Sequence, residues 1–296
     1  MVIVRLKGGL GNQMFQYAFA KQLQKKYCIS EIKLDTSYYS RSYKVSGTQY
    51  NSIDYFDVHY EKATSEDLKE VCKFRHTQKP MTLSYRIPIF LEMLLNKKYY
   101  HIRDFSYVNP KELLAYSYLD GSWQCPKYLE GIEGLLREEF VYKNPISEKV
   151  QIQIDRVKSE NSVFIGVRRG DYVKPANINL YGELGERYYN KAISLIKTKV
   201  ENPVFYVMSD DIEWVKNNIH FDEHVTYRTK EMIGNAHEEM MFMSSCKHAI
   251  IPNSTFHWWG AWLIPGCDKI ITVPYPWFAD GTAIDITPST WTKLER

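Results

Sequence analysis

Short apolar runs alternate with helix-patterned segments along the second half of the chain, and this alternation constrains the fold more than any other feature. The runs are the expected strands, and the segments between them carry apolar residues at helical spacing. In chain order we expect a strand at 162–167, a helix at 188–200, a strand at 204–208, a helix at 212–218, a helix at 240–246, a strand at 248–251, a helix at 256–263 and a strand at 269–273. This alternation predicts an α/β fold with a parallel sheet and helices on both faces.

The amino-terminal residues repeat this order. Val2 to Leu6 is an expected strand, a glycine-rich loop follows, Asn12 to Lys26 is an expected helix, and Ile32 to Asp35 is a short strand. This is the opening of a nucleotide-binding α/β domain. Because the 296 residues lie at the upper end of the range in which single cores divide, about 250–300 residues, we expect two domains. We place them at 1–145 and 146–296, with the boundary near Asn144-Pro145-Ile146-Ser147.

The bulk properties exclude several classes of protein. A net charge of +3 without a clustered basic stripe argues against a nucleic-acid partner. The five cysteines are widely spaced and include no C-x-x-C pair, which favours reduced thiols over a disulfide framework or a zinc site. The sequence shows no secretory signal and no apolar run near the ~20 residues that span a bilayer. We therefore expect a cytoplasmic protein without an integral membrane segment.

One segment allows two interpretations. Arg86 to Leu95 is rich in apolar residues and is followed by Lys97 and Lys98. It is either a helix that lies on a membrane surface or a packed helix with a solvated basic end, and we favour the packed helix.

The first motif that carries chemistry is Gly166-Val-Arg-Arg-Gly-Asp-Tyr172, at the end of an expected strand. Ligands of open α/β sheets bind beyond the carboxyl ends of strands, and arginine offers paired donors to phosphate oxygens. Adjacent residues of a strand point to opposite faces, so we expect one arginine to bind while the other pairs with Asp171 or holds the loop. A surface ion pair is the competing interpretation.

The second motif is Lys7-Gly-Gly-Leu-Gly-Asn-Gln13, between a strand and a helix. Its glycines allow a ligand to approach the backbone, and the start of the helix favours anions. The candidate donor-binding residues here are Gly9, Gly11, Asn12 and Gln13. A tight turn explains the glycines equally well.

Two further motifs follow strands of the second half. In Met208-Ser-Asp-Asp211, either Ser209 or Asp210 is expected to cap the next helix, and two adjacent carboxylates also suit Mg²⁺ or Mn²⁺. We expect no metal there. Asn253, Ser254 and Thr255 open a helix and present hydroxyl and N–H groups to an anion, with capping as the alternative.

Together these four stretches resemble the bacterial α-1,2-fucosyltransferases of glycosyltransferase family 11 type, within the superfamily that shares an H-x-R-R-x-D-like motif. The resemblance implies a GT-B-like α/β fold with two Rossmann-like domains facing a cleft. It implies inverting transfer of L-fucose from GDP-β-L-fucose to a glycan hydroxyl, such as O2 of a terminal galactose in an O-antigen. It implies no metal and no cofactor, an acceptor side in 1–145 and a GDP-sugar side in 146–296. Contact with a lipid-linked acceptor stays open.

The resemblance also implies roles for residues. Arg168 and Arg169 would hold the leaving diphosphate, assisted by Asn253, Ser254 and Thr255, and Ser209 and Asp210 would complete the donor site. Arg169 and Asp171 are the catalytic candidates, while Asp35, His237 and Glu238 remain alternative bases.

The chain departs from the family pattern at two positions. The first histidine of the motif is Gly166 here, and the serine that usually follows Asn-Ser-Thr-Phe is His257. Rival functions are a transferase for another GDP-sugar, a P-loop-like kinase or sulfotransferase, and a non-catalytic carbohydrate-binding protein. A P-loop-like enzyme needs a phosphate loop with a lysine, which the loop from Gly8 to Gln13 lacks. Only the 15% aromatic content supports a carbohydrate-binding protein.

Overall fold

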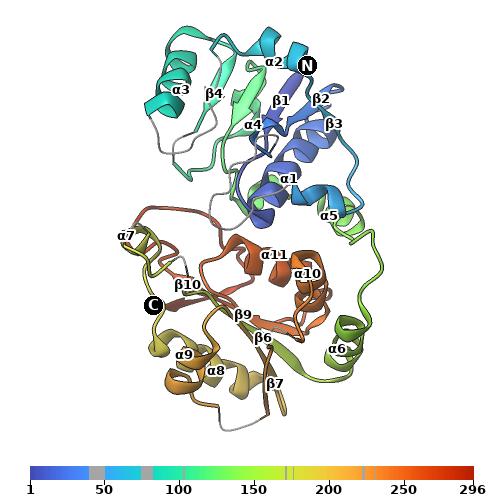
Figure 1. Cartoon of the computed structure of the whole chain (residues 1–296), viewed down its shortest axis with the longest axis vertical. Coiled ribbons are helices and arrows are strands. Elements are labelled where there is room, and N and C mark those ends of the chain that lie inside the picture. The colour runs from blue at the N-terminus through green and yellow to red at the C-terminus, as the bar shows by residue number, and fades with distance from the viewer. Residues whose placement is uncertain are drawn as a thin grey trace. The chain divides into compact units, whose positions relative to one another are not determined.

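The computed structural model describes residues 1–39, 51–74, 83–102, 104–170, 172–175, 177–221, 224–229 and 231–296. The chain forms two compact units (Figure 1). Unit 1 comprises Met1–Phe140 and Ile284–Ile286, and unit 2 comprises Val141–Ala283 and Thr287–Arg296. The first division falls at Phe140–Val141, a few residues before the boundary that the sequence suggests.

Unit 1 is built on a five-stranded parallel sheet in the order β3-β2-β1-β5-β4. The strands are β1 (Val2–Arg5), β2 (Ile32–Asp35), β3 (Glu61–Lys62), β4 (Tyr99–His101) and β5 (Tyr118–Asp120). The helices are α1 (Leu10–Lys26), α2 (Ser65–Val71), α3 (Leu83–Leu95), α4 (Pro110–Leu113) and α5 (Glu133–Glu139), with 3-10 turns at Ser37–Tyr39, Ser52–Tyr55 and Pro126–Tyr128. The strand predicted at 32–35 is confirmed to the residue.

Helix α1 packs deeply into unit 1 because its apolar residues recur every three or four positions. Those predicted from the sequence, Met14, Phe15, Ala18, Phe19 and Leu23, are fully buried. The Phe19 ring stacks on that of Trp123, with 4.0 Å between the ring centres. Gly9 is the N-cap residue and has an extended backbone, so the helix begins at Leu10, slightly earlier than predicted.

Unit 2 contains a six-stranded parallel sheet in the order β11-β10-β9-β6-β7-β8. The strands are β6 (Ser162–Val167), β7 (Val204–Ser209), β8 (Val225–Tyr227), β9 (His248–Ile250), β10 (Ile271–Tyr275) and β11 (Thr292–Glu295). The helices are α6 (Glu148–Ser159), α7 (Ile178–Tyr181), α8 (Glu186–Lys199), α9 (Ile212–Asn218), α10 (Ala236–Ser245) and α11 (Thr255–Leu263). The strand predicted at 162–167 and the helix predicted at 212–218 are confirmed to the residue.

The strand order of unit 2 reverses at β6. β7 pairs with one side of β6, and β9, which comes later in the chain, pairs with the other side. Open parallel sheets bind ligands beyond the carboxyl ends of their strands, where the strand order reverses. Because β6 ends at Val167, the fold brings Arg168 and Arg169 to the position where a ligand is expected.

Helix α3 packs through one side only, which differs from the packed helix that we favoured. Ile89 and Glu92 are buried. Five apolar side chains have exposed fractions between 37% and 65%, namely Ile87, Phe90, Met93, Leu94 and Leu95. Within the described ranges, no helix has the length and apolar character needed to cross a membrane.

Candidate active site

The carboxyl ends of β6, β7 and β9 bring three predicted motifs to one edge of the sheet in unit 2. The motifs are Arg168 and Arg169 after β6, Ser209–Asp211 at the end of β7, and Asn253–Thr255 after β9. Two tyrosines of α8 hold this edge in place. The Tyr189 hydroxyl donates to the Gly166 carbonyl oxygen at 3.2 Å, and the Tyr188 hydroxyl donates to the Ile251 carbonyl oxygen at 2.6 Å.

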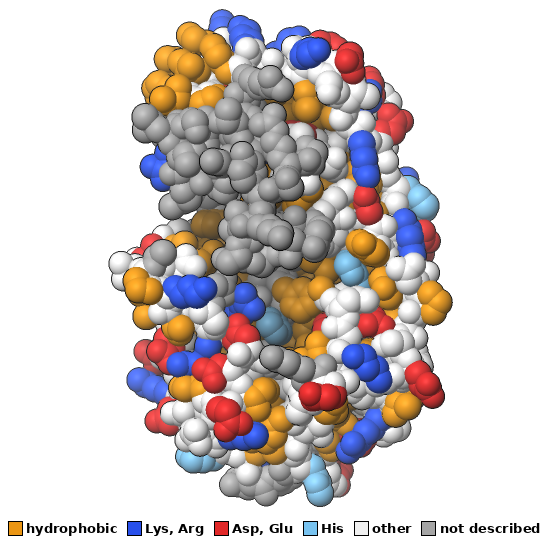
Figure 2. All heavy atoms as spheres, viewed as in Figure 1, with side chains coloured by type: hydrophobic (Ala, Val, Ile, Leu, Met, Phe, Trp, Pro, Cys, Tyr) orange, Lys and Arg blue, Asp and Glu red, His pale blue; other side chains and the backbone are white. Residues whose placement is uncertain are grey.

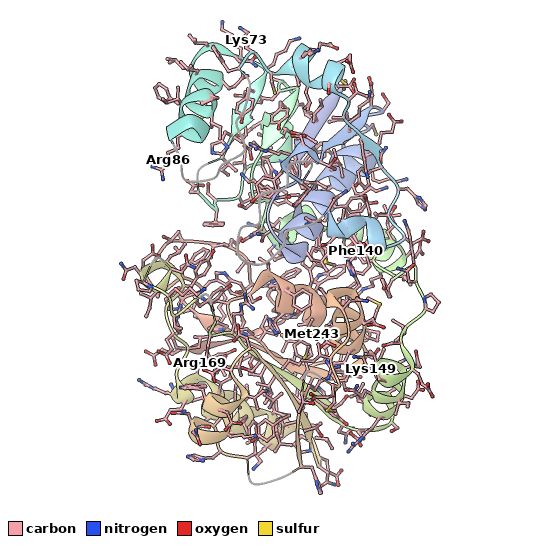
Figure 3. All side chains as sticks on the ribbon, in the orientation of Figure 1. Lys73, Arg86, Phe140, Lys149, Arg169 and Met243 are labelled. Atoms are coloured by element: carbon pink, nitrogen blue, oxygen red, sulfur yellow. The ribbon has the colours of Figure 1, made fainter. Side chains whose placement is uncertain are left out.

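The side chain of Arg169, labelled in Figure 3, is engaged with groups of the protein. Its Nε donates to Asp211 Oδ2 at 3.2 Å, and its Nη1 forms an ion pair with Glu183. Its guanidinium lies 4.1 Å from the centre of the Trp214 ring. Only 15% of the side chain is exposed, so Arg169 supports the loop and the start of α9.

Arg168 is more exposed, at 40% of its side chain. Its Nη1 lies 3.2 Å from Asp210 Oδ2, and its guanidinium lies 5.8 Å from the centre of the Tyr172 ring. An ion pair with this exposure contributes only about 0–1 kcal/mol. An anionic ligand therefore exchanges with the carboxylate at small cost, and Arg168 is the better placed of the two arginines to bind one.

The Ser209-Asp-Asp211 turn connects the arginines to α9. Asp211 Oδ1 accepts a hydrogen bond from the Trp214 N–H at 3.1 Å, which makes Asp211 the N-cap of α9. Ser209 Oγ accepts from the Asp211 N–H at 2.9 Å, and Asp210 Oδ1 accepts from the Arg169 N–H at 2.9 Å. The cap predicted at Ser209 or Asp210 is wrong, because Ser209 still belongs to β7 and only the Asp211 side chain reaches Trp214.

Both carboxylates of this turn thus lie beside arginine side chains. Elsewhere too, in the part of the chain that the structure describes, no group of three or more His, Cys, Asp or Glu side chains is arranged to hold a metal ion.

Asn253 joins two loops at this edge. Its Nδ2 donates to the carbonyl oxygens of Tyr181 at 2.9 Å and Trp277 at 3.1 Å. Ser254 is the N-cap residue of α11 but makes no side-chain capping hydrogen bond, so capping does not explain its hydroxyl. Thr255 begins α11, and the N–H groups of this first turn are the kind that bind anions.

His257 lies against the end of β6, and our sequence analysis did not assign it to the site. A Cβ atom on Gly166 would lie 2.7 Å from Nε2 and 2.8 Å from Cγ of the His257 ring, closer than real Cβ atoms come. The ring is buried, and its Nδ1 has no hydrogen-bond partner among the described residues. The signal available in the sequence is that positions 166 and 257 both depart from the family pattern.

The glycine-rich loop of unit 1 forms a tight turn into α1. Gly8 has a φ of +82°, a conformation that favours glycine. Gly9 is exposed at the N-cap, and Gly11 is buried in the first turn of the helix. Gly9 and the adjacent helix start are therefore the parts of the loop that a ligand can approach.

The two amide side chains of the loop have different surroundings. Gln13 is fully buried, its Nε2 donates to the Gly8 carbonyl oxygen at 3.1 Å, and its Oε1 accepts from the Ile53 N–H at 3.0 Å. Asn12 is partly exposed, and its Oδ1 accepts from Gln124 at 3.0 Å. Gln13 thus maintains the shape of the loop, and Asn12 is the amide closer to solvent.

Three of the four candidate bases have structural contacts. Asp35 is buried and accepts a hydrogen bond from a tyrosine hydroxyl at 2.6 Å. His237 is stacked on Tyr142, with 5.4 Å between the ring centres. Glu238 completes the capping box of α10. Asp171, the fourth candidate, lies outside the described residues.

A cluster of charges that we did not predict lies at the carboxyl edge of unit 1. Asp120, the last residue of β5, is fully buried and accepts from Arg5 Nη1 at 3.0 Å and Lys7 Nζ at 2.6 Å. His101 Nδ1 lies 3.1 Å from the same carboxylate. Burial raises the pKa of Asp120, but the charges of Lys7 and Arg5 outweigh it and hold the pKa well below its ordinary value. The carboxylate is therefore ionised, and the cluster ties β1 to β4 and β5.

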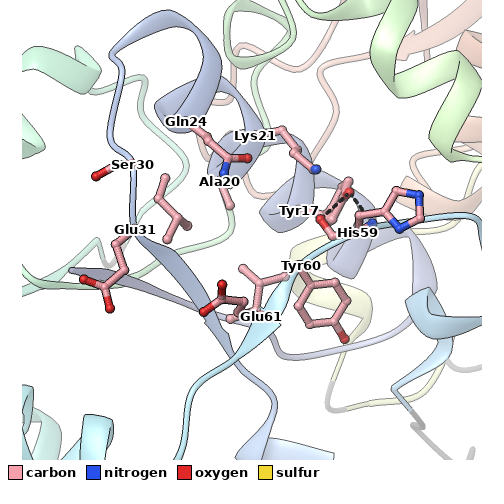
Figure 4. Close-up of a pocket in the computed structure, with 11 residues that line it drawn as sticks. Tyr17, Ala20, Lys21, Gln24, Ser30, Glu31, His59, Tyr60 and Glu61 are labelled. Carbon is pink, nitrogen blue, oxygen red and sulfur yellow. Dashed lines mark hydrogen bonds between the residues drawn. The ribbon is translucent and has the colours of Figure 1, made fainter.

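Unit 1 also has a pocket of about 340 Å³ (Figure 4). It is lined by the second half of α1 and by two further segments, which contribute Ser30, Glu31, Ile32 and Leu34, and His59, Tyr60 and Glu61. In Figure 4 the Tyr17 hydroxyl lies beside His59, whose N–H donates to it at 3.2 Å. Since Ile32 begins β2, the pocket lies at the amino end of that strand, opposite to the edge where such sheets bind ligands.

Comparisons with known proteins identify similar sequences over the whole length. Residues 1–295 match the family described as Glycosyl transferase family 11. The O-antigen biosynthesis glycosyltransferase WbnK of Escherichia coli is 31% identical, over 98% of this chain and 99% of its own. The alpha-1,2-colitosyltransferase of Escherichia coli is 33% identical, over 100% of this chain and 99% of its own. Galactoside alpha-(1,2)-fucosyltransferase 1 of Homo sapiens is 29% identical over 44% of this chain and 38% of its own.

A solved structure has a similar fold. A mutant of Arabidopsis thaliana FUT1 in complex with GDP superposes with a TM-score of 0.50 at 12% identity, over 91% of this chain and 69% of that chain. At this identity the likeness concerns the fold alone. Together with the two parallel α/β sheets it confirms the predicted GT-B-like class.

Proposed function

The chain belongs to glycosyl transferase family 11, and on that basis we propose that it is an inverting glycosyltransferase that moves L-fucose from GDP-β-L-fucose to a glycan hydroxyl. The observation that carries the proposal is the pair Arg168 and Arg169 at the reversal of the strand order in unit 2. The human relative, named for fucosyl transfer to a galactoside, supports the sugar and the acceptor. The solved structure of similar fold is a complex with GDP, in agreement with the nucleotide proposed here.

In the proposed reaction the acceptor oxygen attacks the anomeric carbon, the bond from that carbon to the diphosphate breaks, and GDP leaves. The leaving diphosphate gains negative charge, which a guanidinium and a helix start stabilise. We assign Arg168 to direct contact with the diphosphate, because it is the more exposed arginine, and Arg169 to the support of the loop. Asn253, Ser254 and Thr255, with the Ser209–Asp210 turn, complete the donor site.

The acceptor proton passes to a base in this reaction. Asp35, His237 and Glu238 are occupied by structural contacts. We therefore assign the base to Asp171, which is close to the arginines in sequence. Unit 1 is assigned to the acceptor. In its glycine-rich loop, Gly9 and Asn12 are the residues assigned to ligand contact, and the buried Gly11 and Gln13 maintain the shape of the loop.

The acceptor proposed is O2 of a terminal galactose, in an O-antigen or a similar glycan. The relative named WbnK supports the O-antigen setting. A second candidate is transfer of another GDP-sugar, which the similarity to a colitosyltransferase favours. Parallel reactions with the two GDP-sugars decide which of them is the donor.

We also propose a cytoplasmic location and peripheral contact with a lipid-linked acceptor at an anionic membrane surface. The support is α3, whose exposed apolar side chains gather in the upper left of Figure 2. Arg86 lies in the first turn of α3, Lys73 Nζ donates to the Leu95 carbonyl oxygen at its last residue at 2.9 Å, and Lys97 and Lys98 follow the helix (Figure 3). Its only acidic side chain, Glu92, is buried. Exposed apolar residues flanked by cations suit an anionic bilayer.

One assay tests the enzymatic proposal. The purified protein is incubated with GDP-fucose and a terminal galactoside, and released GDP and fucosylated product are measured. We expect equimolar GDP and product, with substitution at O2 by NMR. A parallel reaction with GDP-colitose decides between the two donors. Absence of product with either donor, from protein that binds GDP, would contradict the proposal.

A further inference from the structure

The imidazole of His257 occupies the space that a side chain at position 166 would fill. Its Nε2 and Cγ lie 2.7 Å and 2.8 Å from where a Cβ atom of Gly166 would be. Any residue with a Cβ would collide with the ring. His257 can therefore take this position only because residue 166 is glycine. The two positions at which the sequence departs from the family pattern are therefore in contact.

Packing alone does not account for this histidine. The ring is only 8% exposed, and its Nδ1 has no hydrogen-bond partner in the described parts of the chain. A buried polar atom without a partner is destabilising, and an apolar ring of similar shape would avoid that cost. Buried polar groups in folded proteins are almost always paired, so the unpaired Nδ1 calls for a partner, and a bound ligand can supply one.

The charge state of the ring suits a role beside an arginine. Burial, and secondarily the positive charge of Arg168, lower the pKa of His257 to about 3. At neutral pH the ring is therefore uncharged, with one nitrogen as a donor and the other as an acceptor. A neutral donor adds a hydrogen bond to an anion without repelling the guanidinium that holds the same anion.

We propose that His257 is a donor-site residue, which Gly166 admits to the end of β6 and which donates a hydrogen bond to the diphosphate that Arg168 binds. This rests on the proposed function in that the ligand is a nucleotide diphosphate. His257 also lies in the first turn of α11, next to Ser254 and Thr255. The imidazole that the family pattern places on the strand is thus supplied by the helix.

The test measures GDP affinity by calorimetry, together with KM for GDP-fucose and kcat, in the full-length protein. His257→Phe keeps a buried ring without its nitrogens, and His257→Ser removes the ring. We expect both to weaken GDP binding on the order of tenfold and to raise KM, since a hydrogen bond to a charged group is lost. His220→Ser, at an exposed histidine, is the matched control and should leave both unchanged.

A second variant exchanges the two positions. Gly166→His alone places two side chains in one volume and should lower the melting temperature. Gly166→His combined with His257→Ser returns an imidazole to that volume from the strand. We expect the double variant to regain most of the GDP affinity that His257→Ser loses.

The outcomes separate the two proposals. Unchanged GDP affinity in His257→Phe would overturn the role of His257, because only the nitrogens are missing. If the folded double variant binds GDP no better than His257→Ser, an imidazole at position 166 does not replace that of His257, and this part of the proposal is wrong. GDP binding without fucosyl transfer by the unaltered protein would overturn the proposed function alone. Failure of the unaltered protein to bind GDP would overturn both.

Discussion

The guanidinium of Arg169 lies 4.1 Å from the centre of the Trp214 ring, whereas the neighbouring Arg168 is turned toward Asp210. The two adjacent arginines therefore differ in their contacts. Arg169 connects the end of β6 to α9 through Asp211, and Arg168 keeps 40% of its side chain exposed. The first prediction separates these roles.

Arg168→Ala should weaken GDP binding by about 10- to 100-fold, because a charge-assisted contact is lost, with little change in melting temperature. Arg169→Ala should weaken binding and also lower the free energy of unfolding, because Asp211 and Glu183 lose their partner. Calorimetry with GDP and thermal unfolding measure the two effects. Equal melting temperatures for both variants would contradict the division of roles.

His257 should make the protein less stable in mild acid. Its folded pKa is about 3, against an unfolded value of about 6.5, so between these values the unfolded chain binds more protons. The free energy of unfolding is therefore undiminished by this histidine above pH 6.5, and it decreases as the pH falls from 6.5 toward 3. His257→Ser should make the fall shallower by up to about 1.4 kcal/mol per pH unit in urea titrations. Parallel curves for variant and unaltered protein would refute this.

Activity should not change when EDTA is added. The carboxylates of Asp210 and Asp211 lie beside Arg168 and Arg169, which provide the positive charge that a metal would otherwise supply. Initial rates of GDP release with and without EDTA measure this. A loss that Mg²⁺ or Mn²⁺ restores would instead favour a metal at the Ser209–Asp211 turn.

The exposed face of α3 should bind anionic vesicles. Phe90→Ser together with Leu94→Ser should reduce cosedimentation with phosphatidylglycerol vesicles at least about tenfold, since two large apolar side chains no longer insert. Ile152→Ser, at a side chain that is 62% exposed on α6, is the matched control. If the double variant partitions like the control, α3 has no part in membrane contact.

Asp120→Asn should destabilise unit 1 strongly. Arg5, with 1% of its surface exposed, would keep its charge without the buried carboxylate that balances it. Removing one partner of a buried pair costs about 3–5 kcal/mol. Glu213→Gln, which breaks the exposed pair with Lys216, should cost less than about 1 kcal/mol. Chemical unfolding of the two variants makes the comparison.

The strands that the sequence revealed are those with long apolar runs. All six residues of β6 are buried, so its pattern is visible without knowledge of the fold. By contrast, β4 (Tyr-Tyr-His) and β5 (Tyr-Leu-Asp) have three residues each, and each ends on a polar residue. Their identity as strands depends on pairing with distant segments, which no local pattern records.

In the candidate site, too, local motifs are visible in the sequence, whereas contacts between distant segments are not. The sequence predicts that the arginine pair and the turns after β7 and β9 lie together, because motifs at strand ends meet at one edge of a parallel sheet. The contact between Gly166 and His257 depends on how α11 packs on β6. The Asp120 cluster likewise requires the pairing of β1 with β5, and neither relationship is encoded in spacing along the chain.

Residues Ile284–Ile286 belong to unit 1 although the chain on either side of them belongs to unit 2. Asp285 lies 3.3 Å from Lys127, and Ile286 is fully buried. The chain therefore passes between the units at Phe140–Val141, Ala283–Ile284 and Ile286–Thr287. A chimaera that exchanges unit 1 between relatives cannot use one junction near residue 140. It must also transplant residues 284–286, or the donated half loses part of its own core.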